Sequence, residues 1–215
     1  MFDGFLRSQA SSDGKSFGAF DELADYNKYV DGKPREDGVR SFLDSRDINL
    51  PEGTADDPPE ADTVRGLGNR KNELLLRLVR EQGVESYEGS VRYVKAAREA
   101  GLARAVVSSS ANCREMLEAA ELTDLFDEVI DGVVAARDHL KGKPAPDTFR
   151  AAARALGIDP GRAAVFEDAL AGVAAGKAGG FGYVIGVDRV GHGDALLRHG
   201  ADRVVRDLAE LLPAP

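Results

Sequence analysis

The most informative stretch of the sequence is Val165-Phe166-Glu167-Asp168-Ala169-Leu170-Ala171-Gly172-Val173. An apolar run over 163–166 ends in two adjacent carboxylates, and small residues that suit a helix follow them. A short apolar run bounded by turn signals is typical of a buried strand in a parallel sheet. Ligands of open α/β sheets bind outside the carboxyl ends of the strands, which is where Glu167 and Asp168 are expected to lie.

The acidic pair Glu167-Asp168 has two interpretations. Adjacent carboxylates repel each other, and a cation held between them removes that cost. Oxygen ligands at a phosphate-handling site suit Mg²⁺. The simpler interpretation is that both residues charge and cap the N-terminus of the following helix, where anions are favourable. This stretch alone favours the simpler interpretation, so other motifs are needed to support a metal site.

From residue 86 onward the pattern predicts alternating helices and strands. The expected strands are short apolar runs, at 105–107, 128–130, 163–166, 183–187 and 202–205. The expected helices lie at 91–100, 112–120, 146–156 and 172–177, with a last short helix through Leu211. Alternation of this kind predicts an α/β fold with a Rossmann-like parallel sheet covered by helices on both faces.

Residues 1 to about 85 contain no convincing strand and are predicted to be mostly helical. Helical spacing of apolar residues predicts short helices near 2–6, 17–26 and 37–43. A loop rich in Pro, Gly and Asp follows at 51–59, and the longest amphipathic pattern is 63–82. We therefore expect a helical domain over 1–85 and an α/β domain over 86–215.

Composition and charge restrict the class of protein. With 215 residues, 43% of them hydrophobic and 30% charged, the chain is typical of a soluble globular protein. No apolar stretch approaches the roughly 20 residues that span a bilayer, and the first residues do not resemble a secretory signal. The single cysteine, Cys113, fits a reducing cytoplasm. A net charge of −9 argues against nucleic-acid binding. We expect a cytoplasmic monomer.

Two further polar motifs occur in the predicted α/β domain. Ser108-Ser109-Ser110 and Asn112 follow a strand and open a helix, where hydroxyls and free N–H groups can bind an anion. Ordinary N-capping by Ser110 or Asn112 is the alternative. The second motif, 142–147, places Lys143 in a Pro-rich turn before a helix, so that its ammonium can lie over a phosphate. A solvated surface lysine is the alternative.

In this order, the hydroxyl turn, the Lys-Pro turn and the acidic pair resemble the motifs of the haloacid dehalogenase superfamily of phosphotransferases. The chain is similar to its β-phosphoglucomutase-like branch, which carries a helical cap domain. The matching motifs are 107–110, 142–147 and 166–173, with weaker support in the helical part from 31–37 and 70–72.

The resemblance implies roles for particular residues. Ser108 would bind the transferring phosphoryl group, Lys143 would neutralise its charge, and Glu167 and Asp168 would hold Mg²⁺. Ser110 and Asn112, in the core, would help bind a substrate phosphate. Lys71 and Arg35, on the cap, would contact the sugar phosphate. For Lys71 and Arg35, a solvated charge is an equally good interpretation.

The first motif of the family is missing from this sequence. It should be an apolar strand ending in Asp-x-Asp-Gly, in which the first Asp is the nucleophile and the second the general acid and base. Phe2-Asp3-Gly4 lacks both the preceding strand and the second Asp. The chain is therefore expected to begin roughly 20–30 residues late, without the central strand of the sheet. The two strand edges left unpaired would cost about 1–3 kcal/mol for each buried polar group.

The resemblance implies Mg²⁺-dependent phosphoryl transfer on a small sugar phosphate, as a mutase or a phosphatase, in a longer protein. The chain as given is expected to bind substrate without turning it over. The alternative is a non-catalytic phosphosugar-binding pseudoenzyme or a gene fragment. Gly191-His192-Gly193 is expected to be only a mobile turn, with His192 a solvated surface residue.

Overall fold

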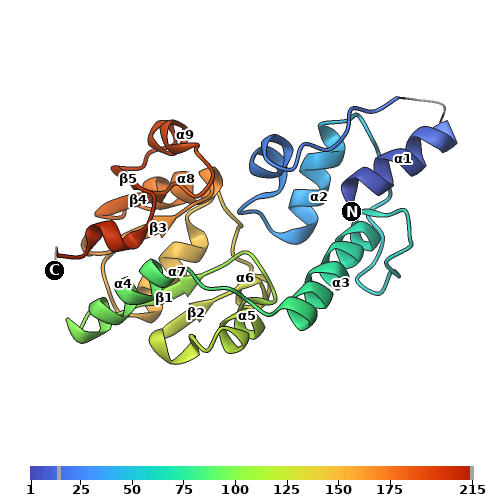
Figure 1. The fold of residues 1–215 in the computed structure, drawn as a ribbon. Coiled ribbons are helices and arrows are strands. Elements are labelled where there is room, and N and C mark those ends of the chain that lie inside the picture. The colour runs from blue at the N-terminus through green and yellow to red at the C-terminus, as the bar shows by residue number, and fades with distance from the viewer. Residues whose placement is uncertain (14–15, 214–215) are drawn as a thin grey trace. The chain divides into compact units, whose positions relative to one another are not determined.

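The computed structural model describes residues 1–13 and 16–213. The contacts within the chain divide it into two units. We call residues 1–31 and 35–82 the helical unit, and residues 32–34 and 83–215 the α/β unit (Figure 1). Within the described ranges, no helix has the length and apolar character needed to cross a membrane.

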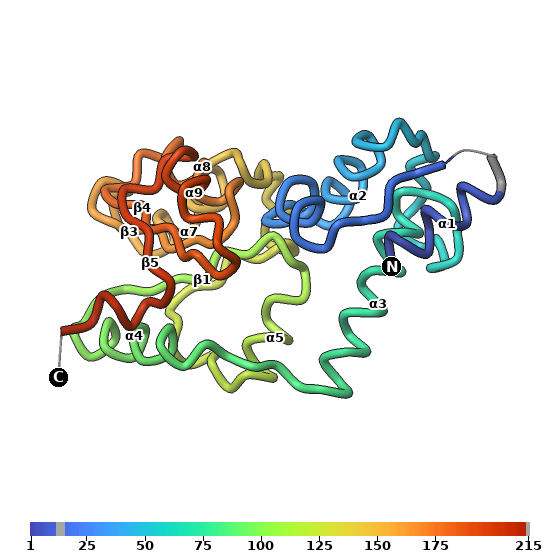
Figure 2. Tube along the Cα trace, turned by 45° about the horizontal axis from the view of Figure 1, so that its top comes forward, coloured from blue at the N-terminus to red at the C-terminus, as the bar shows by residue number. Residues whose placement is uncertain are grey.

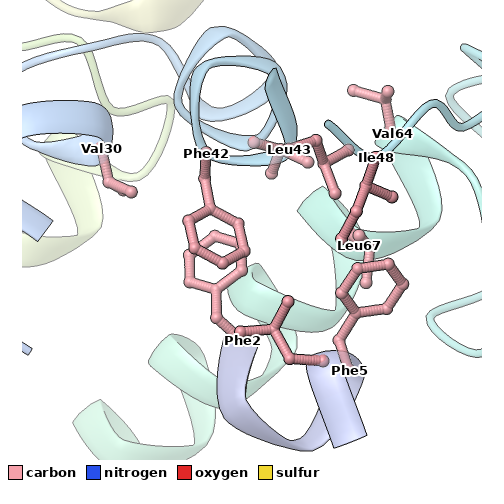
Figure 3. Packing of buried hydrophobic residues seen from close by; sticks show 10 residues of the cluster. Phe2, Phe5, Val30, Phe42, Leu43, Ile48, Val64 and Leu67 are labelled. Atoms are coloured by element: carbon pink, nitrogen blue, oxygen red, sulfur yellow. The ribbon is translucent and has the colours of Figure 1, made fainter. Parts of the chain in front are cut away.

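The helical unit is built around one apolar core. Its elements are α1 (Phe2–Asp13), a π-helical turn (Tyr26–Val30), α2 (Arg35–Asp44) and α3 (Val64–Gln82). The rings of Phe2 and Phe42 lie with their centroids 4.2 Å apart, and Phe5 and Leu67 complete the centre of the core (Figure 3). The helices predicted near 2–6 and 37–43, the loop over 51–59 and the long helix from 63 are confirmed.

The helix predicted over 17–26 is wrong, because helical structure begins only at residue 24. The ring of Phe20 packs against Phe2, with centroids 5.1 Å apart, and the Phe20 N–H donates to Asp3 Oδ1 at 2.9 Å. The Asp21 carboxylate accepts hydrogen bonds from the backbone N–H groups of Leu23 and Ala24. Tertiary packing and this local turn therefore outweigh the helical spacing of the aromatic residues.

The α/β unit contains all five predicted strands. Its strands are β1 (Ala105–Val107), β2 (Glu128–Ile130), β3 (Ala164–Glu167), β4 (Tyr183–Val187) and β5 (Arg203–Val205). Its helices are α4 (Glu88–Glu99), α5 (Cys113–Ala119), α6 (Gly132–Arg137), α7 (Asp147–Ala155), α8 (Leu170–Ala178) and α9 (Gly193–Arg198). Short 3₁₀ turns cover 123–125, 160–162 and 208–211. The sequence did not predict α6 or α9.

The strands pair in parallel, as predicted, but in two separate groups. β1 pairs with β2, with Val106 opposite Val129, and β3 pairs with β4, which pairs with β5. Within the described residues, β1 and β3 have no strand partner on their other edges. The absence of a central strand from the chain stays a prediction.

Alternate residues of β3, β4 and β5 point to opposite faces, and both faces are covered. Val165 and Val184 pack in one core with Val173 of α8 and Leu196 of α9. On the other face, Ile185, Val187 and Val205 pack with Leu208, with Tyr93 of α4 and Phe166 beside them. Figures 1 and 2 show α4 beside the 3₁₀ turn over 208–211, and the two elements are in contact. The prediction of a parallel sheet covered on both faces is therefore confirmed for β3, β4 and β5.

The region around β1 is less completely filled. All three residues of β1 are half-buried, and every residue of α4 keeps part of its surface exposed. A cavity of about 330 Å³ lies here, with apolar walls from α4, α5 and the segments beside them. Ser108 and Ser110 also line it. The end of β1 therefore borders an apolar space that the described residues leave open.

Candidate functional site

Lys143 joins the carboxyl ends of β1 and β3. Its Nζ lies 2.7 Å from Glu167 Oε2 and 3.4 Å from the carbonyl oxygen of Val107. The same ammonium lies 4.9 Å from the centroid of the Phe149 ring, on α7. The side chains of Lys143 and Glu167 are only 5% and 9% exposed. Lys143 is therefore not the solvated surface lysine that was the alternative interpretation of this motif.

The buried pair has a strong electrostatic consequence. Burial raises the pKa of Glu167 above its ordinary value, and Asp168 raises it further, whereas Lys143 lowers it. An ionised carboxylate in this position depends on a cation, because water does not solvate it. Lys143 therefore supplies the positive charge that favours the ionised form of Glu167 at the end of β3.

A glycine of α8 makes room for this carboxylate. A Cβ at Gly172 would lie 2.1 Å from Glu167 Cδ and 2.3 Å from its Cγ. Such distances are well inside van der Waals contact. The glycine in the sequence motif therefore allows the Glu167 side chain to fold back against the first turn of the helix that follows it.

We expect Gly172→Ala to lower the free energy of unfolding by about 1–3 kcal/mol, because the new methyl group must displace the Glu167 side chain. Gly4→Ala is the control, since Gly4 lies in α1 with no atom within 4 Å of its would-be Cβ. Alanine there should instead stabilise by about 0.5–1 kcal/mol through helix propensity. Urea unfolding measures both. Equal gains in the two variants would show that Gly172 is not needed for this packing.

Asp168 is the exposed member of the acidic pair. No hydrogen bond or ion pair of its carboxylate is found within residues 1–13 and 16–213, whereas its backbone carbonyl oxygen lies 3.0 Å from His192 Nε2. The same ranges contain no group of three His, Cys, Asp or Glu side chains that could hold a metal ion. Mg²⁺ usually takes one or two carboxylates and completes its shell with waters and substrate phosphates. Glu167 and Asp168 fit such a site.

The hydroxyl turn at the end of β1 is held by its own side chains. Ser108 Oγ accepts a hydrogen bond from the Ser110 N–H, and Ser110 Oγ accepts one from the Asn112 N–H, both at 3.1 Å. Ser109 Oγ donates to the carbonyl of Gly32 at 2.8 Å. Asn112 is buried and immediately precedes α5, but its side chain makes no capping hydrogen bond to that helix. The turn places Ser108 one residue from the Val107 carbonyl that Lys143 contacts.

The sequence analysis missed Asp131, which supports this turn from β2. Asp131 is 2% exposed, accepts a hydrogen bond from the Val134 N–H at 2.8 Å and pairs with Arg114 Nε at 3.2 Å. The next residue, Gly132, donates its N–H to the Ser110 carbonyl at 3.0 Å. An Asp-Gly dipeptide directly after a predicted strand was the signal that could have identified it.

The helical unit brings Arg35 and Lys71 near each other. Arg35 Nη2 donates to Asn72 Oδ1 at 2.8 Å, and Lys71 Nζ lies 5.9 Å from the centroid of the Tyr26 ring. Burial lowers the pKa of Lys71, Arg35 lowers it further, and Asp31 opposes both. Two neighbouring cations of this kind can bind an anion such as a phosphate. The structure thus groups the predicted residues as one pair in the helical unit and one cluster in the α/β unit.

Comparisons with known proteins show the family of the chain. The profile of the haloacid dehalogenase-like hydrolases matches residues 8–180. The chain is 54% identical over 215 residues to the β-phosphoglucomutase of Mycobacterium bovis, and this alignment covers 99% of this chain and 82% of that protein. It is 35% identical over 129 residues to the trehalose-phosphate phosphatase of Mycobacterium leprae, and this alignment covers 58% of this chain and 28% of that protein.

A crystal structure of the β-phosphoglucomutase of Clostridium difficile superposes with a TM-score of 0.71 at 19% identity, covering 96% of this chain and 83% of that chain. At this identity the likeness concerns the fold alone. The profile match and the identity to the mycobacterial protein extend the likeness to the sequence. The chain therefore belongs to the haloacid dehalogenase-like hydrolases, in their β-phosphoglucomutase-like branch.

Proposed function

We propose that the chain carries the phosphate and cation sites of a Mg²⁺-dependent enzyme that transfers a phosphoryl group on a small sugar phosphate, as a mutase or a phosphatase. The observation that carries this proposal is the buried Lys143–Glu167 pair, 2.7 Å apart, beside the exposed carboxylate of Asp168. The names of the two mycobacterial relatives, a phosphoglucomutase and a sugar-phosphate phosphatase, support this substrate class.

The roles proposed here are those that the resemblance to the family implies, and they suit the chemistry of phosphoryl transfer, in which catalysis is mainly positioning and charge stabilisation. Ser108 binds an oxygen of the transferring group, and Lys143 offsets its negative charge. Glu167 and Asp168 hold Mg²⁺, which when bound supplies further positive charge to the phosphate oxygens. The substrate's own phosphate is bound by Ser110 and Asn112.

The metal site is tested by calorimetric titration of the chain with Mg²⁺ alone. Asp168→Asn is expected to weaken binding at least tenfold, because the exposed carboxylate is the ligand most available to a cation. Asp124→Asn is the control, since Asp124 is an exposed aspartate on a 3₁₀ turn away from the ends of β1 and β3. Equal Mg²⁺ affinity in both variants would reject the assignment of the site.

In the helical unit, Arg35 and Lys71 bind the sugar phosphate in this proposal. Because burial and Arg35 lower the pKa of Lys71, its ammonium loses its proton at a lower pH than an ordinary lysine. Affinity for β-glucose 1-phosphate should therefore fall as the pH rises toward about 10, and Lys71→Arg should remove that fall. The exposed Lys28, substituted in the same way, should leave the pH profile unchanged. Identical profiles for all three proteins would contradict the role of Lys71.

Turnover requires a nucleophile that this sequence does not contain, because no two aspartates are spaced as Asp-x-Asp. A strand ending in Asp-x-Asp, if supplied to the open edges of β1 and β3, would carry such a nucleophile. Residues 1–215 alone then bind a sugar phosphate without turning it over.

A further inference from the structure

The segment after β4 is a structured connection that reaches Asp168. The Asp188 carboxylate accepts hydrogen bonds from the N–H groups of Gly191 at 2.7 Å, His192 at 2.8 Å and Gly193 at 3.0 Å. Burial alone would raise the pKa of Asp188, but these three donors lower it below its ordinary value. The glycines that suggested a mobile turn instead lead into α9, with His192 as the residue before its first turn.

The His192 ring has a defined hydrogen-bonding state. Its Nε2 lies 3.0 Å from the backbone carbonyl oxygen of Asp168, which can only accept, so Nε2 carries the proton. Its Nδ1 is buried and has no hydrogen-bond partner among the residues that the structure describes. A proton on Nδ1 would be a buried donor without an acceptor, which is costly. The geometry therefore assigns a proton to Nε2.

The peptide unit between Asp168 and Ala169 is held at both of its polar ends. Its carbonyl accepts from His192, and its N–H donates to Glu167 Oε1 at 3.3 Å. Glu167 is itself paired with Lys143. Displacement of this peptide would also displace the Cα atom of Asp168 and the side chain that it carries, which has no partner of its own within the described ranges. The backbone that carries the exposed carboxylate is thus held by a contact from a residue 24 positions further along the chain.

We propose that His192 is a positioning residue for the cation site, because its Nε2–H fixes the peptide after Asp168 and so directs the Asp168 carboxylate toward the bound cation. This inference rests on the proposed Mg²⁺ site. A ligand that is held in place before the metal arrives loses less freedom on binding, and the groups that orient a ligand affect metal affinity about tenfold or more.

The test compares two substitutions of His192 that both introduce a side-chain amide but differ in side-chain length. In His192→Gln the amide nitrogen can replace Nε2, whereas in His192→Asn the side chain is too short to reach the Asp168 carbonyl. His199→Ala is the matched control, because His199 Nδ1 also contacts a backbone carbonyl, that of Ala195, but lies at the far end of α9. Two properties are measured in each protein, the hydrogen-exchange rate of the Ala169 amide without metal and the affinity for Mg²⁺ alone by calorimetry.

We expect His192→Asn to speed Ala169 exchange and weaken Mg²⁺ binding, each by about tenfold. His192→Gln and His199→Ala should stay within about twofold of the unmodified chain. Equal values in the Asn and Gln variants for both properties would overturn the proposal. If the unmodified chain binds no Mg²⁺, the proposed metal site fails, and the Ala169 exchange rate alone then decides whether His192 positions this peptide.

Discussion

Replacing Lys143 with methionine is expected to lower the free energy of unfolding by about 3–5 kcal/mol at neutral pH. The substitution leaves the Glu167 carboxylate, which is 9% exposed, without the cation that lies 2.7 Å from it. Burial already raises the pKa of Glu167, and loss of Lys143 raises it further. The Glu167 carboxyl group of the variant therefore keeps its proton to a higher pH.

This mechanism also sets the pH dependence of the Lys143→Met variant. The folded-state pKa of Glu167 lies above its unfolded-state value, so its contribution to stability is fully present below about pH 4 and is lost as the pH rises through the folded-state pKa. Urea unfolding between pH 4 and 7 should therefore show a deficit relative to the unmodified chain that grows with pH. Replacing both residues, as Lys143→Met with Glu167→Leu, should restore most of the loss.

Lys141→Met is the matched control, because Lys141 is exposed and lies two residues away in the same loop. Its effect should stay within about 0.5 kcal/mol. If Lys143→Met is no more destabilising than Lys141→Met, the pair does not hold the ends of β1 and β3, and the site must be described differently.

Supplying a strand that ends in Asp-x-Asp-Gly ahead of α1 is expected to convert binding of β-glucose 1-phosphate into turnover. Loss of a covalent nucleophile costs about 10⁴- to 10⁶-fold in rate, so the gain over residues 1–215 should be at least 10⁴-fold. The structural reason is that β1 and β3 each offer an unpaired edge within the described residues, and the apolar cavity of about 330 Å³ beside β1 is open to further packing.

A version with Asn-x-Asp-Gly separates packing from chemistry. It should raise the unfolding midpoint as much as the Asp-x-Asp strand does, because it pairs and packs in the same way, but it should not turn over substrate. Turnover by residues 1–215 alone at the rate of the extended chain would contradict the proposal. Absence of turnover in every version, with binding retained, would favour the non-catalytic alternative.

The strands could be predicted because their signals are local. Runs such as 105–107 and 183–187 are apolar and β-branched and are bounded by turn residues, and the structure confirms them. The helices α6 and α9 were missed because each has only six residues, too few for a clear amphipathic repeat. The prediction over 17–26 failed for the opposite reason, since its aromatic spacing fits a helix while the Phe20 ring is needed in the core.

The members of the candidate site could be named from their motifs, but their interactions could not. The sequence suggested that Lys143 and Glu167 lie near one phosphate, whereas the structure pairs them directly in a buried position. A lysine is usually exposed, so its burial depends on tertiary packing that no local pattern reports. The contacts of His192 with Asp168 and of Asp131 with Arg114 also join residues distant in sequence, and motif spacing carries no signal for them.

We propose that the chain holds a cation and a sugar phosphate in one site, with the cation on the Glu167-Asp168 pair. Calorimetric titration with β-glucose 1-phosphate, with and without Mg²⁺, tests it most directly, because ligands that share a site must alter each other's affinity reciprocally. We predict that saturating Mg²⁺ tightens binding of the sugar phosphate at least fivefold and that Asp168→Asn abolishes this gain. Equal affinity with and without Mg²⁺, or a gain that survives in Asp168→Asn, would contradict the account.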